Sequence, residues 1–247
     1  MRLAVAQIRP EVGPVELNVN RHVALIDLAI ARDVDLVVFP ELSLTGYEPQ
    51  RAADFARCSN DPCFSIFQLL ANANRMTIGV GVPIRSARLP SISMLIFRPD
   101  SEMLVYSKQY LHPDEEPYFK TGAGAPNLIV ETTPISLAIC YEISVAQHAR
   151  QAKASGATVY IASVAKTESG MENAHLRLAQ IAFENDMIVM VSNCLGSMDN
   201  SECGGRSGAW DATGRLLAEL GASGEGIVLL DLNTLESGVV ELPKTRQ

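Results

Sequence analysis

Three polar residues stand directly after apolar segments, at points where a chain leaves a protein core. The segments and the residues that follow them are 36–40 before Glu41, 103–107 before Lys108 and 135–139 before Cys140. A carboxylate serves as a general base, an ammonium stabilises a developing oxyanion, and a thiol becomes a nucleophile when it loses its proton. Together the three groups suit attack on the carbon of an amide or a nitrile, through a thioester or thioimidate intermediate.

Each of the three side chains has local surroundings that bear on this chemistry. Glu41 follows a buried segment and a proline, so partial desolvation is expected to raise its pKa and make it a better base near neutral pH. Cys140 lies between a strand and a helical pattern, and the positive end of a helix favours the thiolate. Taken singly, each residue also fits a structural role: a solvated loop Glu, a solvated Lys at a strand end, and a buried, inert Cys.

The chain around these residues carries three sequence blocks in a set order. They are Phe39-Pro40-Glu41 with Gly46-Tyr47, then Lys108 with Glu115 and Tyr118–Gly122, then Ile139–Glu142. Weaker matches lie at Asn193 and at 204–207. In these blocks, and over essentially the whole length of the chain, the sequence resembles the nitrilase superfamily of carbon–nitrogen hydrolases.

This resemblance implies a Glu-Lys-Cys triad in an α/β fold, a four-layer α-β-β-α sandwich. Cys140 would be the nucleophile, Glu41 the general base, and Lys108 the group that stabilises the tetrahedral intermediate. A second active-site Glu is implied shortly before the Tyr-Phe-x-x-Gly segment, at Glu115 rather than at Glu116.

The resemblance also bears on the substrate, on cofactors and on assembly. It implies that no metal or organic cofactor takes part. The tyrosines of the three blocks, Tyr47, Tyr118 and Tyr141, are expected to contact the substrate. A homodimer is implied as well, with sheets extended across the subunits.

One segment departs from the pattern of many amidases and nitrilases of this family. Residues 161–167 read IASVAKT, where many members have a stretch with Trp or Pro, and this segment is expected to line the pocket. One hypothesis for Lys166 is that it holds a substrate carboxylate as a point charge, which would favour ω-amides of dicarboxylic acids or N-carbamoyl amino acids. A solvated loop lysine is the alternative.

Alternating strand and helix patterns must position these residues. The predicted strands are Leu3–Ile8, Asp35–Pro40, Thr77–Pro83, Ser91–Arg98, Ile135–Cys140, Ala157–Ala162, Met187–Ser192 and Gly226–Leu232. The predicted helices are Val15–Ala31, Ser65–Asn74, Ser144–Ser155 and Met171–Asn185, and hairpins are predicted around 83–90 and 207–221. This order is typical of an α/β fold, whose ligands bind at the carboxyl ends of the strands.

Neither a repeat nor a linker interrupts this order, so a single domain is predicted. It spans residues 1–247. The polar tail after Asn233 is expected to be mobile or to lie at a subunit interface.

The composition indicates a globular protein with an acidic surface. The chain of 247 residues carries a formal net charge of −8, and its isoelectric point is about 5.1. This charge argues against nucleic acid or an anionic membrane as the main partner. The first residues do not resemble a signal peptide, and no apolar stretch reaches the ~20 residues of a membrane span, so a cytoplasmic location is expected.

The cysteines, five in number, do not suggest a disulfide framework, because an odd count leaves one unpaired. Buried, inert thiols are predicted for most of them. A zinc site from Cys58, Cys63, Cys194 and Cys203 receives little support from their spacing. Among the cysteines, Cys140 alone has a setting that favours chemistry.

The sequence therefore predicts a hydrolase that cleaves a non-peptide C–N bond of a small amide, such as an aliphatic amide, an ω-amide or an N-carbamoyl compound. Two alternatives stay open: a nitrile-hydrolysing member of the family, and a non-hydrolytic binding or regulatory member. A Cys–His pair with His112, His148 or His175 is a weaker hypothesis, because the last two lie in helical patterns. Serine-hydrolase and nucleotide-binding functions lack their G-x-S-x-G and G-x-G-x-x-G motifs.

Overall fold

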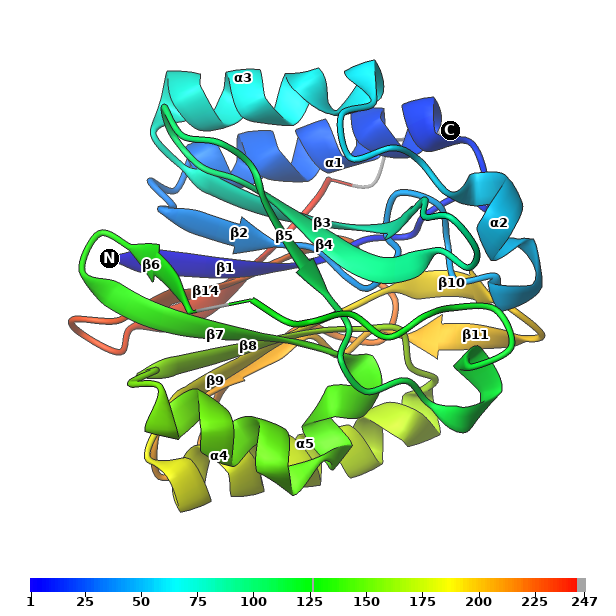
Figure 1. The fold of residues 1–247 in the computed structure, drawn as a ribbon. Helices are drawn as coiled ribbons and strands as arrows, with labels where there is room; N and C mark the ends of the chain where they lie inside the picture. Colours follow the sequence, from blue (N-terminus) through cyan, green and yellow to red (C-terminus); the bar gives the residue numbers. More distant parts are fainter. Residues whose placement is uncertain (126, 244–247) are drawn as a thin grey trace.

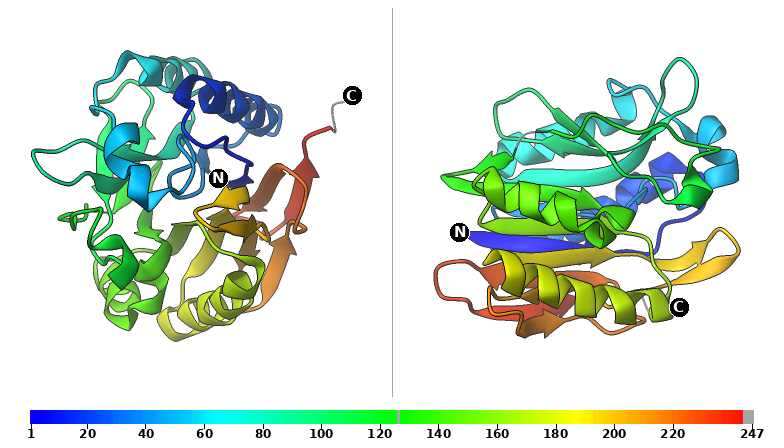
Figure 2. Two further views of the ribbon diagram at one scale, coloured as in Figure 1. Left: turned by 90° about the vertical axis from the view of Figure 1, so that its right-hand side faces the viewer. Right: turned by 60° about the horizontal axis from the view of Figure 1, so that its bottom comes forward.

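Two β-sheets pack face to face, and a pair of helices covers the outer face of each. The computed structural model describes residues 1–125 and 127–243. Figure 1 shows α1 (Val15–Ile30) and α3 (Ser65–Asn74) above the sheets, and α4 (Ala146–Ala154) and α5 (Glu168–Asn185) below them. Figure 2 shows the same layers from two other sides. The predicted four-layer α-β-β-α sandwich is confirmed.

The first sheet has seven strands and lies against α1 and α3. Its order is β15 (Ser237–Glu241), β14 (Gly226–Asp231), β1 (Arg2–Gln7), β2 (Leu36–Val38), β3 (Thr77–Ile84), β4 (Ser91–Phe97) and β5 (Leu104–Ser107). Strands β1, β2 and β3 are parallel, and the outer strands pair antiparallel. The parallel strands are continuous apolar runs because helices cover one face and the second sheet covers the other.

The second sheet has six strands and lies against α4 and α5. Its order is β13 (Leu216–Glu219), β12 (Gly208–Trp210), β9 (Ile188–Asn193), β8 (Val159–Val164), β7 (Thr133–Ile139) and β6 (Leu128–Val130). Strands β7, β8 and β9 are parallel. After β9, the chain forms a separate hairpin of β10 (Leu195–Met198) and β11 (Ser201–Gly204).

The remaining helices are short and lie in the connections. They are η1 (Pro49–Arg51), α2 (Ala52–Phe55), η2 (Pro62–Phe64), η3 (Pro113–Glu115) and η4 (Cys140–Ser144). Within residues 1–125 and 127–243, none of the helices is long and apolar enough to cross a membrane.

Three apolar layers hold the sandwich together, one between the sheets and one under each helix pair. In the middle layer, Val38 of β2 and Ile139 of β7 are almost completely buried. Under the helices, Ile26 of α1 and Leu178 of α5 are buried as well. Burial of one such side chain contributes about 1.5–3 kcal/mol relative to exposure. The ends of β2 and β7, which precede two of the predicted site residues, are therefore anchored in the core.

The predicted strands and helices are all present, with small differences in their bounds. Helix α3 begins and ends where predicted. Helix α5 begins at Glu168 rather than at Met171, because the Thr167 hydroxyl accepts the N–H of Gly170 and caps the helix there.

Strands β6, β10, β11 and β15 were not predicted. The stretch predicted as a tail contains β15, which pairs with β14. Residues 244–247 of that tail lie outside the described residues.

Candidate active site

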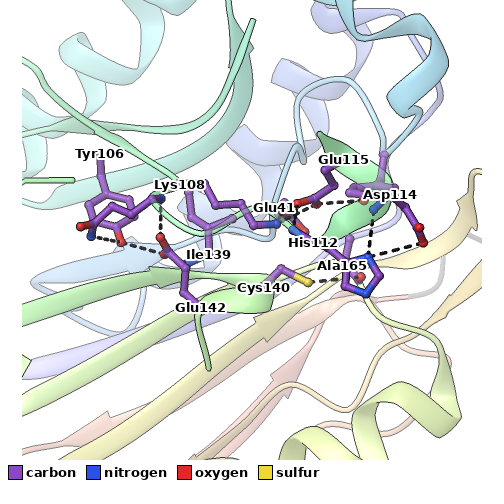
Figure 3. A network of polar contacts seen from close by, with 12 residues as sticks. Glu41, Tyr106, Lys108, His112, Asp114, Glu115, Ile139, Cys140, Glu142 and Ala165 are labelled. Atoms are coloured by element: carbon purple, nitrogen blue, oxygen red, sulfur yellow. Dashed lines mark hydrogen bonds and ion pairs between the residues drawn. The ribbon is translucent and has the colours of Figure 1, made fainter. Parts of the chain in front are cut away.

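Glu41, Lys108 and Cys140 come together at one edge of the sandwich, after β2, β5 and β7. Lys108 Nζ lies 2.7 Å from Glu41 Oε1, and the Lys108 side chain is fully buried. Cys140 approaches this pair from the other sheet (Figure 3). The structure thus gathers into one cluster the three residues of the predicted triad, which are far apart in the sequence.

A glycine allows the Glu41 loop to lie close to β3. A Cβ at Gly81 would overlap the backbone at Pro40 and Leu42, so the two segments approach closely only because residue 81 is glycine. Leu42 has a left-handed backbone with φ of 50°, which turns the chain directly after Glu41. As a result, the Glu41 side chain is fully buried.

Lys108 has an anchored backbone and two carboxylate partners. Its N–H donates to the Ile92 carbonyl at 2.9 Å, and its carbonyl accepts the N–H of Gly122 at 2.7 Å. A buried ammonium is costly unless it is paired and hydrogen-bonded. Lys108 Nζ meets this need with Glu41 and with Glu115 Oε1, the latter also at 2.7 Å.

Cys140 lies on a sharp turn between β7 and η4. Its φ of 42° is a left-handed conformation that residues other than glycine rarely adopt. Glu142 supports this turn, because its Oε2 accepts the backbone N–H of Ile139 at 2.7 Å. Cys140 Sγ lies 3.9 Å from the carbonyl oxygen of Ala165, which follows β8 (Figure 3). Cys140 as a whole residue is partly exposed.

Glu115, the predicted second Glu, joins Lys108 to Tyr47. Its Oε1 accepts hydrogen bonds from Lys108 Nζ at 2.7 Å and from the Tyr47 hydroxyl at 2.9 Å. Its Oε2 accepts the backbone N–H of His112 at 2.8 Å. Glu115 is 1% exposed, whereas Glu116 is exposed. The cluster therefore contains Glu115 and not Glu116.

The sequence profile of the carbon–nitrogen hydrolase family matches residues 2–237. The chain belongs to this family. It is 27% identical over 243 residues to an (R)-stereoselective amidase of Pseudomonas sp., with 96% of this chain and 87% of that protein covered. It is 28% identical over 214 residues to a 2-oxoglutaramate amidase of Bacillus subtilis, with 85% and 82% covered.

The fold is similar to that of an amidase from Nesterenkonia sp. AN1. The TM-score is 0.85 at 23% identity, and the match covers 94% of this chain and 93% of that structure. That structure shows acrylamide added at the active-site cysteine of the Nesterenkonia amidase. At this identity the likeness concerns the fold alone. The predictions of a carbon–nitrogen hydrolase and of its sandwich fold are confirmed.

Burial sets the acid–base properties of the cluster in this carbon–nitrogen hydrolase. Loss of solvation raises the pKa of Glu41 to about 7, although the charge of Lys108 opposes the change. Burial would lower the pKa of Lys108, but the charges of Glu41, Cys140 and Glu115 raise it above its ordinary value, so Lys108 remains an ammonium. Among the described residues, Glu41 Oε2 has no hydrogen-bond partner. That oxygen is free to accept a proton near neutral pH.

The thiol of Cys140 departs from the sequence-based expectation. Burial and then the negative charge of Glu41 raise its pKa to about 11, while Lys166 and Lys108 lower it, in that order. The net pKa shift of Cys140 is therefore opposite to the lowering that was expected from a helix end. The segment that follows the sulfur is the short η4, and α4 begins only at Ala146.

The predicted substrate-binding residues lie at different depths around the cluster. Tyr47 bonds to Glu115, as described above. The ring of Tyr141 meets the ring of His112 edge to face, with centroids 5.2 Å apart. Tyr118 packs against the apolar layer between the sheets. Lys166 lies after β8, next in sequence to Ala165, and is partly buried.

A second buried polar network, which the sequence did not reveal, adjoins the Cys140 turn. Glu142 Oε2 accepts the Tyr106 hydroxyl at 2.7 Å, and Glu142 Oε1 accepts the backbone N–H of Gln109 at 2.6 Å. His148 Nε2 lies 2.9 Å from the same Tyr106 hydroxyl. His148 thus bonds to this network and not to Cys140. The one sequence feature that could have indicated this network was Glu142, which lies two residues after Cys140 in the third block.

Two of the cysteines form a disulfide. Cys194 and Cys203 are linked, with 5.4 Å between their Cα atoms, so the prediction of inert thiols is wrong for this pair. Their spacing alone did not show that the β10–β11 hairpin brings them together. Cys58 and Cys63 are free. The zinc alternative is excluded in its predicted form, because it would need Cys194 and Cys203 as thiolates.

A large cavity lies outside this site. A cavity of about 680 Å³ at the amino ends of β2 and β3 is lined by residues that include Asp35, Arg75, Arg98 and Glu131, and by none of the cluster. Over the described part of the chain, no group of three or more His, Cys, Asp or Glu side chains is arranged to hold a metal ion.

Proposed function

We propose that this chain hydrolyses a small non-peptide amide through a thioester on Cys140. One observation carries the proposal: Cys140 lies on a left-handed turn beside Glu41, whose carboxylate is buried against Lys108 and keeps one oxygen free within the described structure. Nucleophile, base and cation are thus held in place before the substrate arrives. The matched family and the amidases to which the chain is similar support this assignment.

In the first half of the reaction, Glu41 accepts the thiol proton while the sulfur attacks the carbonyl carbon. Because the pKa of Cys140 is about 11 and that of Glu41 about 7, the proton moves as the S–C bond forms rather than before. Lys108 Nζ stabilises the resulting oxyanion, together with the first N–H groups of η4, which have no partner inside that helix. Glu41 then gives the proton to the leaving nitrogen, so ammonia or an amine departs and a thioester remains.

In the second half, Glu41 takes a proton from water, and the hydroxide attacks the thioester carbon. The S–C bond breaks, the carboxylic acid leaves, and Cys140 recovers its proton from Glu41. Glu115 accepts a second hydrogen bond from Lys108 Nζ, and Tyr47 donates to Glu115. These two residues therefore position the cation.

Ammonia release from a mixed panel tests the proposal. The panel holds simple aliphatic amides, ω-amides, N-carbamoyl amino acids and nitriles. Wild type is compared with Cys140→Ala, and Cys63→Ala is the matched control because Cys63 is a free thiol outside the cluster. We expect release by wild type and by the control, and none by Cys140→Ala.

Two outcomes would contradict the proposed amide hydrolysis and support another function. Release from nitriles alone would indicate a nitrile-hydrolysing enzyme. No release from any compound, together with slow alkylation of Cys140 by a small electrophile, would favour a non-hydrolytic binding or regulatory protein.

Lys166 supports a narrower substrate class, an amide that carries a carboxylate. Its charge acts on Cys140, and within the described residues it forms no ion pair with a protein carboxylate. A substrate carboxylate would supply the missing partner. One similar protein is a 2-oxoglutaramate amidase, and 2-oxoglutaramate carries a carboxylate.

Substitution of Lys166 separates acidic from neutral amides. A hydrogen bond to a charged group contributes about 1.5–3 kcal/mol, so Lys166→Met is expected to lower kcat/KM for an acidic ω-amide roughly 10- to 150-fold. A neutral amide of the same length, such as butyramide beside succinamate, should be affected far less. An equal loss on both compounds would exclude a carboxylate-binding role for Lys166.

We also propose a homodimer that forms through α5. Leu176 and Phe183 lie two turns apart on this helix and are 75% and 70% exposed. Large apolar side chains on one exposed helix face are typical of interfaces. With a two-fold axis midway between these two side chains, Leu176 of one copy would meet Phe183 of the second, and the contact would be self-complementary as a two-fold dimer requires.

A further inference from the structure

A single side-chain amide holds the backbone of Lys166 from two sides. The N–H of Lys166 donates to Asn193 Oδ1 at 2.9 Å, and Asn193 Nδ2 donates to the Lys166 carbonyl at 3.0 Å. The same Nδ2 donates to the Gly205 carbonyl at 2.7 Å, and Asn193 is fully buried. Because both the N–H and the carbonyl of Lys166 are bonded to Asn193, this residue fixes the backbone from which the Lys166 side chain extends.

A disulfide reinforces this arrangement. Cys194 directly follows Asn193, and Cys203 directly precedes Gly204, whose N–H also donates to the Lys166 carbonyl at 2.9 Å. The disulfide therefore links the residues next to the two holding groups, the side-chain amide of Asn193 and the backbone N–H of Gly204.

The held segment faces the sulfur of Cys140. The carbonyl oxygen of Ala165, the residue before Lys166, lies 3.9 Å from Cys140 Sγ (Figure 3). Ala165 also packs against both half-cystines of the disulfide. The charged groups that act on the thiol are Glu41, Lys166, Lys108 and Glu115. A shift of the Lys166 backbone would therefore change the electrostatic potential at the sulfur.

We propose that Asn193 is a positioning residue which, with the Cys194–Cys203 disulfide behind it, holds the Lys166 ammonium beside Cys140. Neither Asn193 nor the disulfide touches the reacting atoms. The inference rests on the proposed role of Cys140 as the nucleophile, but it concerns the place of Lys166 and is testable without turnover.

The pH dependence of Cys140 alkylation by iodoacetamide tests this inference. Lys166→Met removes the cation and is expected to raise the apparent pKa of alkylation. Asn193→Ser is too short to bond both peptide groups, so it should act in the same direction and lower the rate about three- to tenfold at a pH below that apparent pKa. In the Lys166→Met background, Asn193→Ser should have no further effect, because the cation that it positions is gone.

Asn18 offers a matched control. Its Oδ1 accepts the N–H of Glu11 at 2.8 Å, and its Nδ2 donates to the Glu11 carbonyl at 2.7 Å. Asn18 thus holds the backbone of Glu11 as Asn193 holds that of Lys166, at a place far from Lys166 in the sequence. Asn18→Ser therefore reports the general effect of losing a buried amide. Any change that it causes in alkylation should be the same with and without Lys166.

A double variant, Cys194→Ala with Cys203→Ala, provides a second probe if Asn193→Ser does not fold. It should raise the apparent pKa of alkylation by less than Asn193→Ser does, and only when Lys166 is present. An unchanged alkylation profile in the folded variants would overturn the inference, and so would a shift of equal size in the Lys166→Met background. Failure of wild type to release ammonia would count against the proposed hydrolysis instead, because alkylation does not require turnover.

Discussion

At the scale of single residues, the protonation state of Glu41 is expected to govern the rate. Its carboxylate must accept the thiol proton, and burial raises its pKa to about 7. Below this pH Glu41 is protonated and cannot act as the base, so kcat/KM should rise with pH through an apparent pKa near 7. Steady-state ammonia release over a range of about pH 5 to 9 measures this rise.

Glu41→Gln removes the base while it keeps the shape of the side chain. We expect kcat to fall about 10²- to 10⁴-fold and the rise with pH near 7 to disappear. If the same pH dependence persisted in the variant, the titrating group would have to be another residue.

Glu115 and Glu116 form a matched pair of neighbouring carboxylates, one buried and one exposed. Glu115→Gln would leave Lys108 with Glu41 as its one charged partner and weaken the bond from Tyr47, so kcat is expected to fall by about 10- to 10³-fold. Glu116→Gln should leave kcat essentially unchanged. Parallel kinetics of the two variants decide the assignment, and the reverse order would give the role to Glu116.

At the scale of the elements, Glu142 ties the two sheets together next to the nucleophile turn. Its carboxylate accepts the N–H of Ile139 at the end of β7 and the N–H of Gln109 just after β5. Glu142→Gln would turn an amide NH₂ toward one of these donors and leave it unsatisfied in the core. We expect the free energy of unfolding to fall by about 1–3 kcal/mol, measured by urea denaturation.

Tyr106→Phe is the comparison for Glu142→Gln. It removes the hydroxyl that donates to Glu142 Oε2 and that also bonds to His148 Nε2 and Gln109 Nε2, but it leaves both backbone donors to Glu142 paired. Its effect on the free energy of unfolding should therefore be smaller. Equal losses in the two variants would contradict the idea that Glu142 acts through the backbone of the two strand ends.

At the scale of the whole molecule, the exposed face of α5 is expected to determine assembly. Phe183→Glu would place a charge in the proposed two-fold contact, so its mass in solution should be that of a monomer while wild type is a dimer. Leu69→Glu is the matched control, because Leu69 is 64% exposed and belongs to α3, which covers the other sheet from α5. Static light scattering at micromolar concentration separates the outcomes, and a monomeric wild type would refute the dimer.

The order of strands and helices, and the residues at their ends, could be predicted from the amino-acid sequence alone. These features have local causes: short apolar runs predict strands, and periodic apolar positions predict helices. Glu41, Lys108 and Cys140 were recognisable because each follows such a run and because the surrounding blocks resemble a family. The β10–β11 hairpin had no comparable local signal, since Cys194 to Gly204 contains single apolar residues among small and polar ones and no apolar run.

The pairing of the polar residues and their pKa values could not be predicted in this way, because both depend on how the chain packs. Lys108 has two carboxylate partners because β2, β5 and η3 converge, and no local pattern encodes that convergence. The pKa of Cys140 rises because burial and the charge of Glu41 outweigh the nearby lysines. Desolvation and charge–charge distance depend on segments that are remote in sequence, so both are properties of the packed chain. The same holds for the amide of Asn193 and the disulfide beside it, which contact Lys166 only after β8, β9 and the hairpin have come together.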